Sequence, residues 1–195
     1  MTPVAYEIVV VGTSWGGLSA LRELMGGLPN PLGLPIVVVQ HRHKESDNLL
    51  TTLLQDDTPL RVSEVEDKAP IAPGNVYVAP SDYHLLVERG HFSLTTEAPV
   101  RHSRPSIDVA FDSVASSYGA RAIGVVLTGA NADGAAGLRR IADRGGLAVV
   151  QNPQTAESPA MPTAALGAVP GARVLTIGEI ASLIGTLDAP RANDS

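Results

Sequence analysis

Residues 7–17 read Glu-Ile-Val-Val-Val-Gly-Thr-Ser-Trp-Gly-Gly, a short β-branched run followed by a glycine-rich turn. The run from Glu7 to Val11 is too short for a helix and is apolar on both faces, which is typical of a buried parallel strand. After the turn, the stretch from Gly17 to Gly27 carries apolar residues at helical spacing and ends in a glycine pair. It predicts a helix with an apolar face made of Leu18, Leu21, Leu24, Met25 and Leu28.

The same alternation of strand and helix continues along the chain. Short apolar runs predict further strands at residues 36–39, 122–127, 147–150 and 173–177. This order predicts the α/β class, with a doubly wound, mostly parallel sheet flanked by helices. The remaining helices are expected over residues 107–118, 135–143, 161–166 and 178–187, and after an N-cap at Ser46-Asp47 in a segment with an apolar face of Leu49, Leu50, Leu53 and Leu54.

The middle of the chain has a different character. Residues 68–79 are punctuated by prolines, and two runs typical of strands, at 85–88 and 92–95, flank the turn Arg89-Gly90. We therefore expect a small antiparallel hairpin as an appendage to the parallel sheet.

The composition indicates one folded domain. The chain has 195 residues, 44% of them hydrophobic and 17% charged, which suits a single domain over residues 1–188 with 189–195 as a disordered tail. The absence of cysteine excludes disulfides and a thiol nucleophile. A net charge of -6 without a basic block argues against nucleic acid as a partner. No run suits a membrane span or a signal peptide, so we predict a cytoplasmic protein with no membrane insertion.

The turn after the first predicted strand contains the pattern G-x-S-x-G, centred on Ser14. Between a strand and a helix this pattern is typical of a nucleophile elbow, in which helix amides beside the serine can stabilise an oxyanion. The other interpretation is a serine that only caps the helix, and spacing alone favours neither. A phosphate-binding loop is less well supported, because both common glycine-rich nucleotide patterns are missing.

Two further polar residues follow other predicted strands at their carboxyl ends. His41 comes after the second strand and can act as a general base, while Asp133 follows the strand at 122–127 and can orient an imidazolium. Taken singly, His41 is more simply a surface histidine and Asp133 a helix cap. Because ligands bind at the carboxyl ends of parallel strands, the three side chains together predict one site. The chain order Ser, His, Asp differs from that of α/β-hydrolases.

A metal centre is the remaining interpretation of the histidines. His41 and His43 are two residues apart, and the other histidines are scattered without a common zinc-ligand spacing. We therefore expect neither a metal nor a cofactor.

The motifs around Ser14, His41 and Asp133 resemble the catalytic domain of the chemotaxis receptor methylesterases, the CheB family. The resemblance implies Ser14 as nucleophile, His41 as base and Asp133 as the orienting acid, with the backbone amides of Trp15 and Ala130 as oxyanion donors. The similar segments run in the family's order through nearly the entire chain: Val11–Gly17, Gln40-His41, Pro73–Pro80, Arg104–Asp108, Leu127–Gly137, Gln151-Asn152 and Met161-Pro162.

The resemblance also implies a substrate and a partner. It predicts a serine hydrolase that removes methyl groups from glutamyl γ-methyl esters on cytoplasmic helical segments of methyl-accepting chemoreceptors, resetting signalling adaptation. The alternatives are a noncatalytic module that binds those receptors and a deamidase that acts on receptor glutamines with the same site. Loss of ester hydrolysis without loss of binding in Ser14→Ala separates the first alternative from an esterase.

The sequence departs from the family pattern at three places. Trp15 stands where the family has a small residue, Arg42-His43 replaces Met-Pro, and the stretch Ala130–Asp133 replaces Met-Gly-Asn-Asp. These changes leave groove shape and substrate preference open. A receiver domain, which a typical member of the family carries before the catalytic domain, is also not found in this sequence, so we expect constitutive activity or control by a separate regulatory protein.

Overall fold

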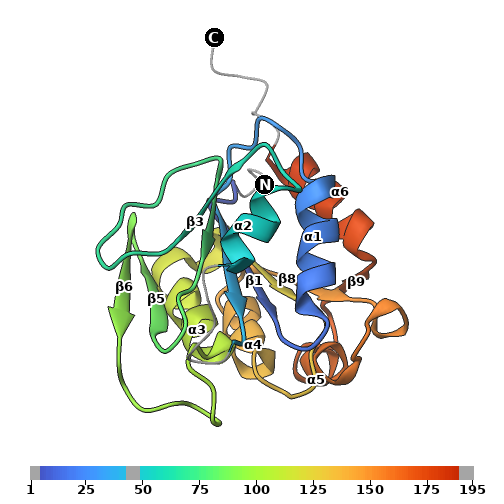
Figure 1. Cartoon of the computed structure of the whole chain (residues 1–195). Coiled ribbons are helices and arrows are strands. Elements are labelled where there is room, and N and C mark those ends of the chain that lie inside the picture. The colour runs from blue at the N-terminus through green and yellow to red at the C-terminus, as the bar shows by residue number, and fades with distance from the viewer. Residues whose placement is uncertain (1–4, 43–48, 189–195) are drawn as a thin grey trace.

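A computed structural model describes residues 5–42 and 49–188. Within these ranges seven parallel strands form one sheet in the order β3-β4-β2-β1-β7-β8-β9 (Figure 1). The strands are β1 (Ile8–Thr13), β2 (Ile36–Gln40), β3 (Arg61–Glu64), β4 (Asn75–Val78), β7 (Ala122–Val126), β8 (Leu147–Gln151) and β9 (Arg173–Leu175).

Helices cover both faces of this sheet, which confirms the predicted doubly wound architecture (Figure 1). On β1, Val9 and Val11 belong to one core with three helices, while Ile8 and Val10 belong to the other core. The first face is covered by α1 (Gly17–Gly27), α2 (Leu49–Gln55) and α6 (Ile177–Leu187), and the second by α3 (Ile107–Tyr118), α4 (Ala135–Asp143) and α5 (Ala160–Ala168). Single 3-10 turns lie at η1 (Gly119–Arg121) and η2 (Pro153–Thr155).

The predicted hairpin is also confirmed. Strands β5 (His84–Glu88) and β6 (His91–Thr95) pair antiparallel in a separate two-stranded sheet. The hairpin packs against α3, where the Val87 N–H donates to Ser113 Oγ at 2.9 Å. Phe92 meets Tyr77 of β4 edge to face, with ring centroids 4.9 Å apart. The appendage therefore shares the core on the α3 side of the sheet.

The sequence missed two strands of the main sheet. Strand β4 lies within the proline-punctuated residues 68–79, and β3 lies in the stretch before them, for which the sequence predicted no element. Each has four residues, and β4 lies just before Pro80, so its local signal is weak. The main-chain partners of β4 come from β2 on one side and β3 on the other, contacts that no local pattern encodes.

Two predicted apolar faces and one strand end also need correction. Leu18 is 40% exposed and Leu49 is 60% exposed, and each lies in the first turn of its helix. Strand β9 ends at Leu175 rather than residue 177, because Thr176 and Glu179 form a capping box that begins α6. The expected N-cap at Ser46-Asp47 and the tail at 189–195 lie outside the described residues.

The strand order reverses between β1 and β7, which makes their carboxyl ends the expected place for a site. From β1 the chain builds the sheet through β2 in one direction, and from β7 it continues through β8 in the other. The loops that follow β1, β2 and β7 carry Ser14, His41 and Asp133. No helix among the described residues is long and apolar enough to cross a membrane.

Candidate active site

Ser14 lies in a sharp turn between β1 and α1. The Ser14 N–H donates to Thr128 O at 3.0 Å, and Ser14 O accepts the Gly17 N–H at 2.9 Å. Gly16 has a φ of 76°, and a Cβ there would lie 2.8 Å from the Cβ of Glu157. The turn therefore needs glycine at this position both for its backbone conformation and for space.

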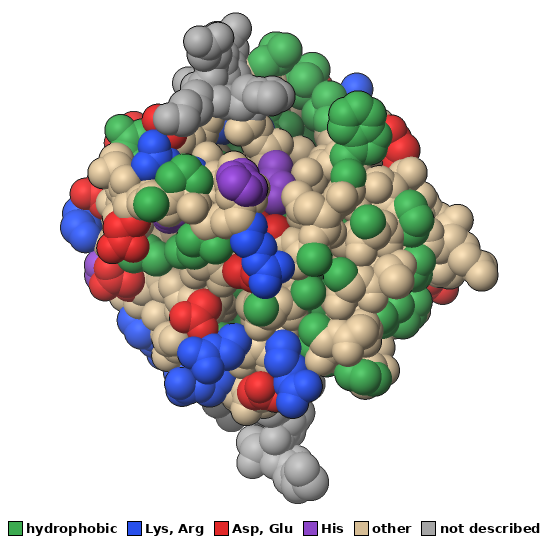
Figure 2. Space-filling model, turned by 90° about the horizontal axis from the view of Figure 1, so that it is seen from below, with side chains coloured by type: hydrophobic (Ala, Val, Ile, Leu, Met, Phe, Trp, Pro, Cys, Tyr) green, Lys and Arg blue, Asp and Glu red, His purple; other side chains and the backbone are tan. Residues whose placement is uncertain are grey.

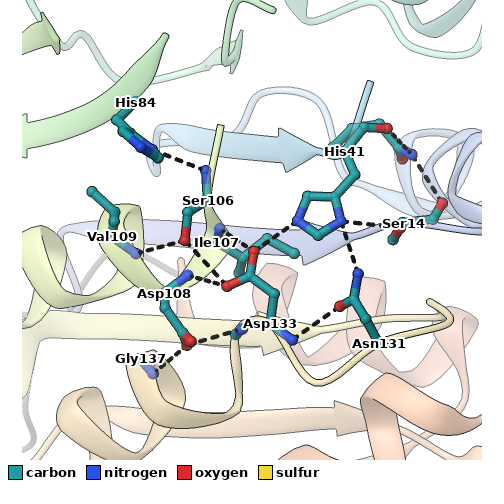
Figure 3. Close-up of polar contacts among 12 residues, drawn as sticks. Ser14, His41, His84, Ser106, Ile107, Asp108, Val109, Asn131, Asp133 and Gly137 are labelled. Atoms are coloured by element: carbon teal, nitrogen blue, oxygen red, sulfur yellow. Dashed lines mark hydrogen bonds and ion pairs between the residues drawn. The ribbon is translucent and has the colours of Figure 1, made fainter. Parts of the chain in front are cut away.

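His41 follows the last residue of β2 and faces Ser14. Its Nδ1 lies 3.1 Å from Ser14 Oγ (Figure 3). The carboxamide of Gln40 holds both residues, because its Nε2 donates to Ser14 O at 2.9 Å and to His41 O at 3.2 Å. The His41 N–H also donates to Thr13 O, which ties the turn after β2 to the end of β1. Ser14 and His41 are thus held next to each other by contacts at two strand ends.

Asp133 completes a chain of hydrogen bonds. Its Oδ2 lies 2.7 Å from His41 Nε2 (Figure 3). An ionised carboxylate only accepts hydrogen bonds, so Nε2 carries the proton and the lone pair of Nδ1 faces the Ser14 hydroxyl. This tautomer is the one that can remove a proton from Ser14. The structure thus brings together the three side chains that the sequence selected.

The Asp133 carboxylate is buried, with a side chain 3% exposed, and is surrounded by donors. Besides His41, its two oxygens accept the N–H groups of Ile107 at 2.7 Å and Asp108 at 2.9 Å, and the Ser106 hydroxyl at 3.2 Å. Burial by itself raises the pKa of Asp133, but the hydrogen bonds from His41, Asp108 and Ile107 outweigh it and lower the pKa below its usual value. Asp133 is therefore held as the anion that His41 needs.

Asp133, which precedes α4, caps α3, and Asp108 in α3 caps α4 in turn. Asp133 accepts the first N–H groups of α3. Asp108, in the first turn of α3, accepts the N–H of Gly134 just before α4 at 2.9 Å and the N–H of Gly137 within α4 at 2.7 Å. Burial raises the pKa of Asp108, and the nearby charge of Asp133 raises it further. The capping interpretation of Asp133 is correct in kind, but the helix that it caps is α3 rather than its own.

The two amides expected to stabilise an oxyanion belong to two turns that meet at Ser14. Within the described residues, neither the Trp15 N–H nor the Ala130 N–H donates a hydrogen bond to protein. The turn at Gly129 lies against the serine, since a Cβ there would be 3.0 Å from Ser14 Cβ. Thr128 joins the two turns, because its hydroxyl donates to Trp15 O at 2.9 Å. Two free amide donors beside a serine can bind a developing oxyanion.

A groove of about 640 Å³ opens beside Ser14 and His41. The face drawn in Figure 2 carries histidine, basic and acidic side chains near its middle, with hydrophobic side chains beside them. Trp15 is 67% exposed at the groove, whereas the Arg42 side chain is 7% exposed and bonds to Glu64 Oε2 at 2.9 Å. The lining residues also include Leu18, Gln40, Asp82, Pro99, His102 and Arg104.

Sequence reasoning missed several residues that build this site. Gln40 bonds to Ser14 and His41, Ser106 and Asp108 bond to Asp133, and Asn131 contacts His41 directly. Gln40 was detectable as the last strand residue before His41, whereas the contacts of Ser106 and Asp108 span 25 or more positions of sequence. In the part of the chain that the structure describes, no group of three or more His, Cys, Asp or Glu side chains is arranged to hold a metal.

The chain is similar to proteins of one known family. A family model described as CheB methylesterase matches residues 9–184. The chain belongs to the CheB methylesterase family. Within it, a Leptospira interrogans protein named for both protein-glutamate methylesterase and protein-glutamine glutaminase is 45% identical over 184 residues, covering 94% of this chain and 95% of the relative.

Other CheB methylesterase relatives differ in length. A protein-glutamate methylesterase/protein-glutamine glutaminase from Carboxydothermus hydrogenoformans is 38% identical over 91% of this chain, which spans only 54% of that relative. The crystal structure of the Thermotoga maritima CheB methylesterase catalytic domain matches with a TM-score of 0.89 and 32% identity, covering 94% of this chain and 100% of that one. The fold is that of a CheB catalytic domain.

Proposed function

We propose that this chain hydrolyses glutamyl γ-methyl esters with Ser14 as nucleophile, His41 as general base and Asp133 as the orienting acid. The observation that carries the proposal is the hydrogen-bonded chain from Ser14 Oγ to His41 Nδ1, at 3.1 Å, and from His41 Nε2 to Asp133 Oδ2, at 2.7 Å. Such a chain supports acyl transfer, because it activates a hydroxyl and stabilises the imidazolium that forms.

Acylation begins when Ser14 Oγ attacks the ester carbonyl and its proton passes to His41 Nδ1. The carbonyl oxygen becomes an oxyanion, for which the free N–H groups of Trp15 and Ala130 are suitable donors. The bond between carbon and the methoxy oxygen then breaks, and the proton on Nδ1 moves to that oxygen. Methanol leaves, and the glutamyl side chain remains bound to Ser14 as an ester.

Deacylation repeats these steps with water as the nucleophile. His41 Nδ1 takes a proton from water as its oxygen attacks the acyl-enzyme, and then returns the proton to Ser14 Oγ when the bond to carbon breaks. The product is a free glutamate side chain. Apart from the substrate and water, no group outside the chain has to supply a proton or an electron pair.

We also propose that the ester is carried by a cytoplasmic helical segment of a methyl-accepting chemoreceptor. The names of the relatives support a glutamyl substrate within a protein. The site supports it as well, because the groove lies open at the surface and Trp15 is exposed at its edge. A side chain that projects from a helix can reach Ser14 there without unfolding the helix.

Methanol release from methylated receptor membranes tests the proposal. Wild type is expected to release methanol, while Ser14→Ala and His41→Ala lose several orders of magnitude of turnover. Ser182→Ala is the matched control, since Ser182 is an exposed α6 residue whose hydroxyl donates only to Gly178 O of the same helix. Near-normal methanol release by Ser14→Ala would refute Ser14 as the nucleophile.

Receptor binding by the same variant tests the noncatalytic alternative. An esterase loses methanol release in Ser14→Ala but keeps its affinity for methylated receptor segments. If wild type binds these segments and releases no methanol, the chain is a binding module and the proposed reaction is wrong.

A further inference from the structure

Asn131 shares the catalytic nitrogen of His41 with Ser14. Its Nδ2 lies 3.2 Å from His41 Nδ1, the same atom that Ser14 Oγ approaches at 3.1 Å (Figure 3). The orientation of the amide is set at its other end, where Oδ1 accepts the Asp133 N–H at 2.9 Å. A backbone N–H can only donate, so Oδ1 faces Asp133 and the NH₂ group faces His41.

This arrangement puts a fixed donor at the place where the leaving group is protonated. His41 Nδ1 has one lone pair in the ring plane, and whatever oxygen or nitrogen leaves the substrate must come within hydrogen-bond distance of that atom. The Asn131 amide is already within that distance, and Asn131 is exposed in the turn after β7. A leaving group that reaches His41 therefore also reaches Asn131.

We propose that Asn131 makes the site selective for oxygen leaving groups over nitrogen leaving groups, and so for methyl esters over glutamine amides. The inference rests on the proposed function, since it assigns a substrate preference to the same reaction. Asn131 donates a hydrogen bond to the departing atom while His41 delivers a proton to it. The preference for esters depends on whether the departing atom can accept the hydrogen bond and the proton at the same time.

The two substrates differ in lone pairs. When the carbon–oxygen bond of a methyl ester breaks, one lone pair of the methoxy oxygen takes the proton from Nδ1 and a second accepts the Asn131 N–H, so methanol forms with both contacts kept. The nitrogen of a primary amide has one lone pair, which takes the proton from Nδ1, and its own hydrogens then face the Asn131 NH₂ group. The departing nitrogen therefore has no lone pair free to accept the hydrogen bond from Asn131, and that N–H group is left unpaired.

The test uses two matched peptides of one receptor segment, carrying either a glutamyl γ-methyl ester or a glutamine at the same position. Methanol and ammonia release give kcat and KM for each. In Asn131→Ala we expect kcat for the ester to fall about tenfold and kcat for the amide to change less than about threefold, with both KM values nearly constant. Asn75→Ala is the matched control, because the side-chain amide of Asn75 bonds only to backbone oxygens of the turn before β4.

A second variant separates the two hydrogen bonds of the Asn131 side chain, the one that Nδ2 donates toward His41 and the one that Oδ1 accepts from Asp133. Asn131→Asp keeps an oxygen to accept the Asp133 N–H but replaces the donor that faces His41, so overall rates fall and the ester-to-amide ratio is expected to fall as well. Equal fold losses for both peptides in both variants would overturn the inference and leave Asn131 a structural residue. If wild type itself releases no methanol in a Ser14-dependent way, the proposed function fails instead, so the two failures are distinguishable.

Discussion

Asp133 combines a proposed role in the chemistry with a role in the fold. Its carboxylate accepts a hydrogen bond from His41 and three from the start of α3. In Asp133→Asn, the new amide places a donor where acceptors are needed, so the His41 tautomer that activates Ser14 is no longer favoured. We expect kcat to fall by roughly 10³ to 10⁴ and the free energy of unfolding by about 1 to 3 kcal/mol.

Methanol release and urea unfolding of the same samples measure the two effects. His41→Ala is the control, because it removes the base but leaves the three hydrogen bonds from α3 in place. If Asp133→Asn loses activity with no loss of stability, the capping contacts contribute little. If it keeps near-normal kcat, Asp133 does not orient His41.

The lowered pKa of Asp133 predicts how its stabilising effect depends on pH. The pKa lies below the ordinary value of 3.8 in the folded protein, so folding favours the ionised form. A carboxyl of this kind stabilises the fold above its unfolded pKa, and the effect is lost as pH falls through the folded pKa. The difference in unfolding free energy between wild type and Asp133→Asn is therefore expected to be constant near neutral pH and to shrink below about pH 4. Urea unfolding across this range measures it, and a difference that does not change with pH contradicts the assignment.

At the scale of the elements, α3 and α4 are joined by their exchanged caps. Asp108 Oδ1 accepts both N–H groups from α4, so an amide oxygen at the same place can keep both contacts. The raised pKa of Asp108 means that ionisation at neutral pH opposes folding, first through burial and then through the charge of Asp133. We expect Asp108→Asn to leave the unfolding free energy at neutral pH unchanged or raise it by up to about 1 kcal/mol, whereas Asp108→Ala lowers it by about 1 kcal/mol. Denaturant unfolding of both variants checks this, and equal losses would show that the charge itself stabilises the caps.

The turn between β1 and α1 requires a glycine at position 16. Ala at Gly16 has to adopt a φ near 76° with its Cβ 2.8 Å from Glu157 Cβ, so the turn must move. We expect Gly16→Ala to lower the unfolding free energy by about 1 to 2 kcal/mol and to reduce kcat, because Ser14 moves with the turn. Gly167→Ala in α5 is the matched control: a Cβ there meets no described atom within 4 Å, so stability should hold or rise. Thermal unfolding measures the change in stability, and methanol release measures the change in kcat. A normal kcat in Gly16→Ala would refute the idea that the position of Ser14 depends on this turn.

Long elements could be predicted from the sequence, but contacts between elements could not. The helix over Gly17–Gly27 was predicted with its observed bounds, because its spacing and its terminal glycines are local signals. The strand β4 was missed because its four residues gain their order from β2 and β3. For the same reason the sequence pointed to Asp133 but not to the helix that it caps, and it placed His41 near Ser14 without the Asn131 contact.

At the scale of the whole molecule, the direction reversal between β1 and β7 collects the site from three distant parts of the chain. Ser14, His41 and Asp133 each follow a different strand, and the helices on both faces bury the strands that hold them. This is why the predicted sheet sufficed to select the three side chains before any contact was known. The groove beside them has no such sequence signal, since its walls come from the turn after β1, the end of β2 and the segment 99–105.

The exposed edge of that groove predicts how a receptor helix is held. Trp15 is 67% exposed and Leu18 is 40% exposed, and both line the groove beside Ser14. An apolar surface next to a nucleophile suits the apolar stripe of a helical substrate, and a buried tryptophan at such an interface contributes a large share of the affinity. Trp15→Ala keeps the backbone N–H proposed to bind the oxyanion but removes the indole ring.

We therefore expect Trp15→Ala to raise KM for a methylated receptor segment about tenfold, with kcat nearly unchanged, since the ring contributes to binding rather than to the reaction. A small glutamyl γ-methyl ester that cannot reach the ring should show no change in kcat/KM. Val174→Ala is the control, because Val174 is 45% exposed on β9 and does not line the groove. An equal loss on both substrates would mean that Trp15 acts at the reacting ester, and no loss on either would mean that the helix docks elsewhere.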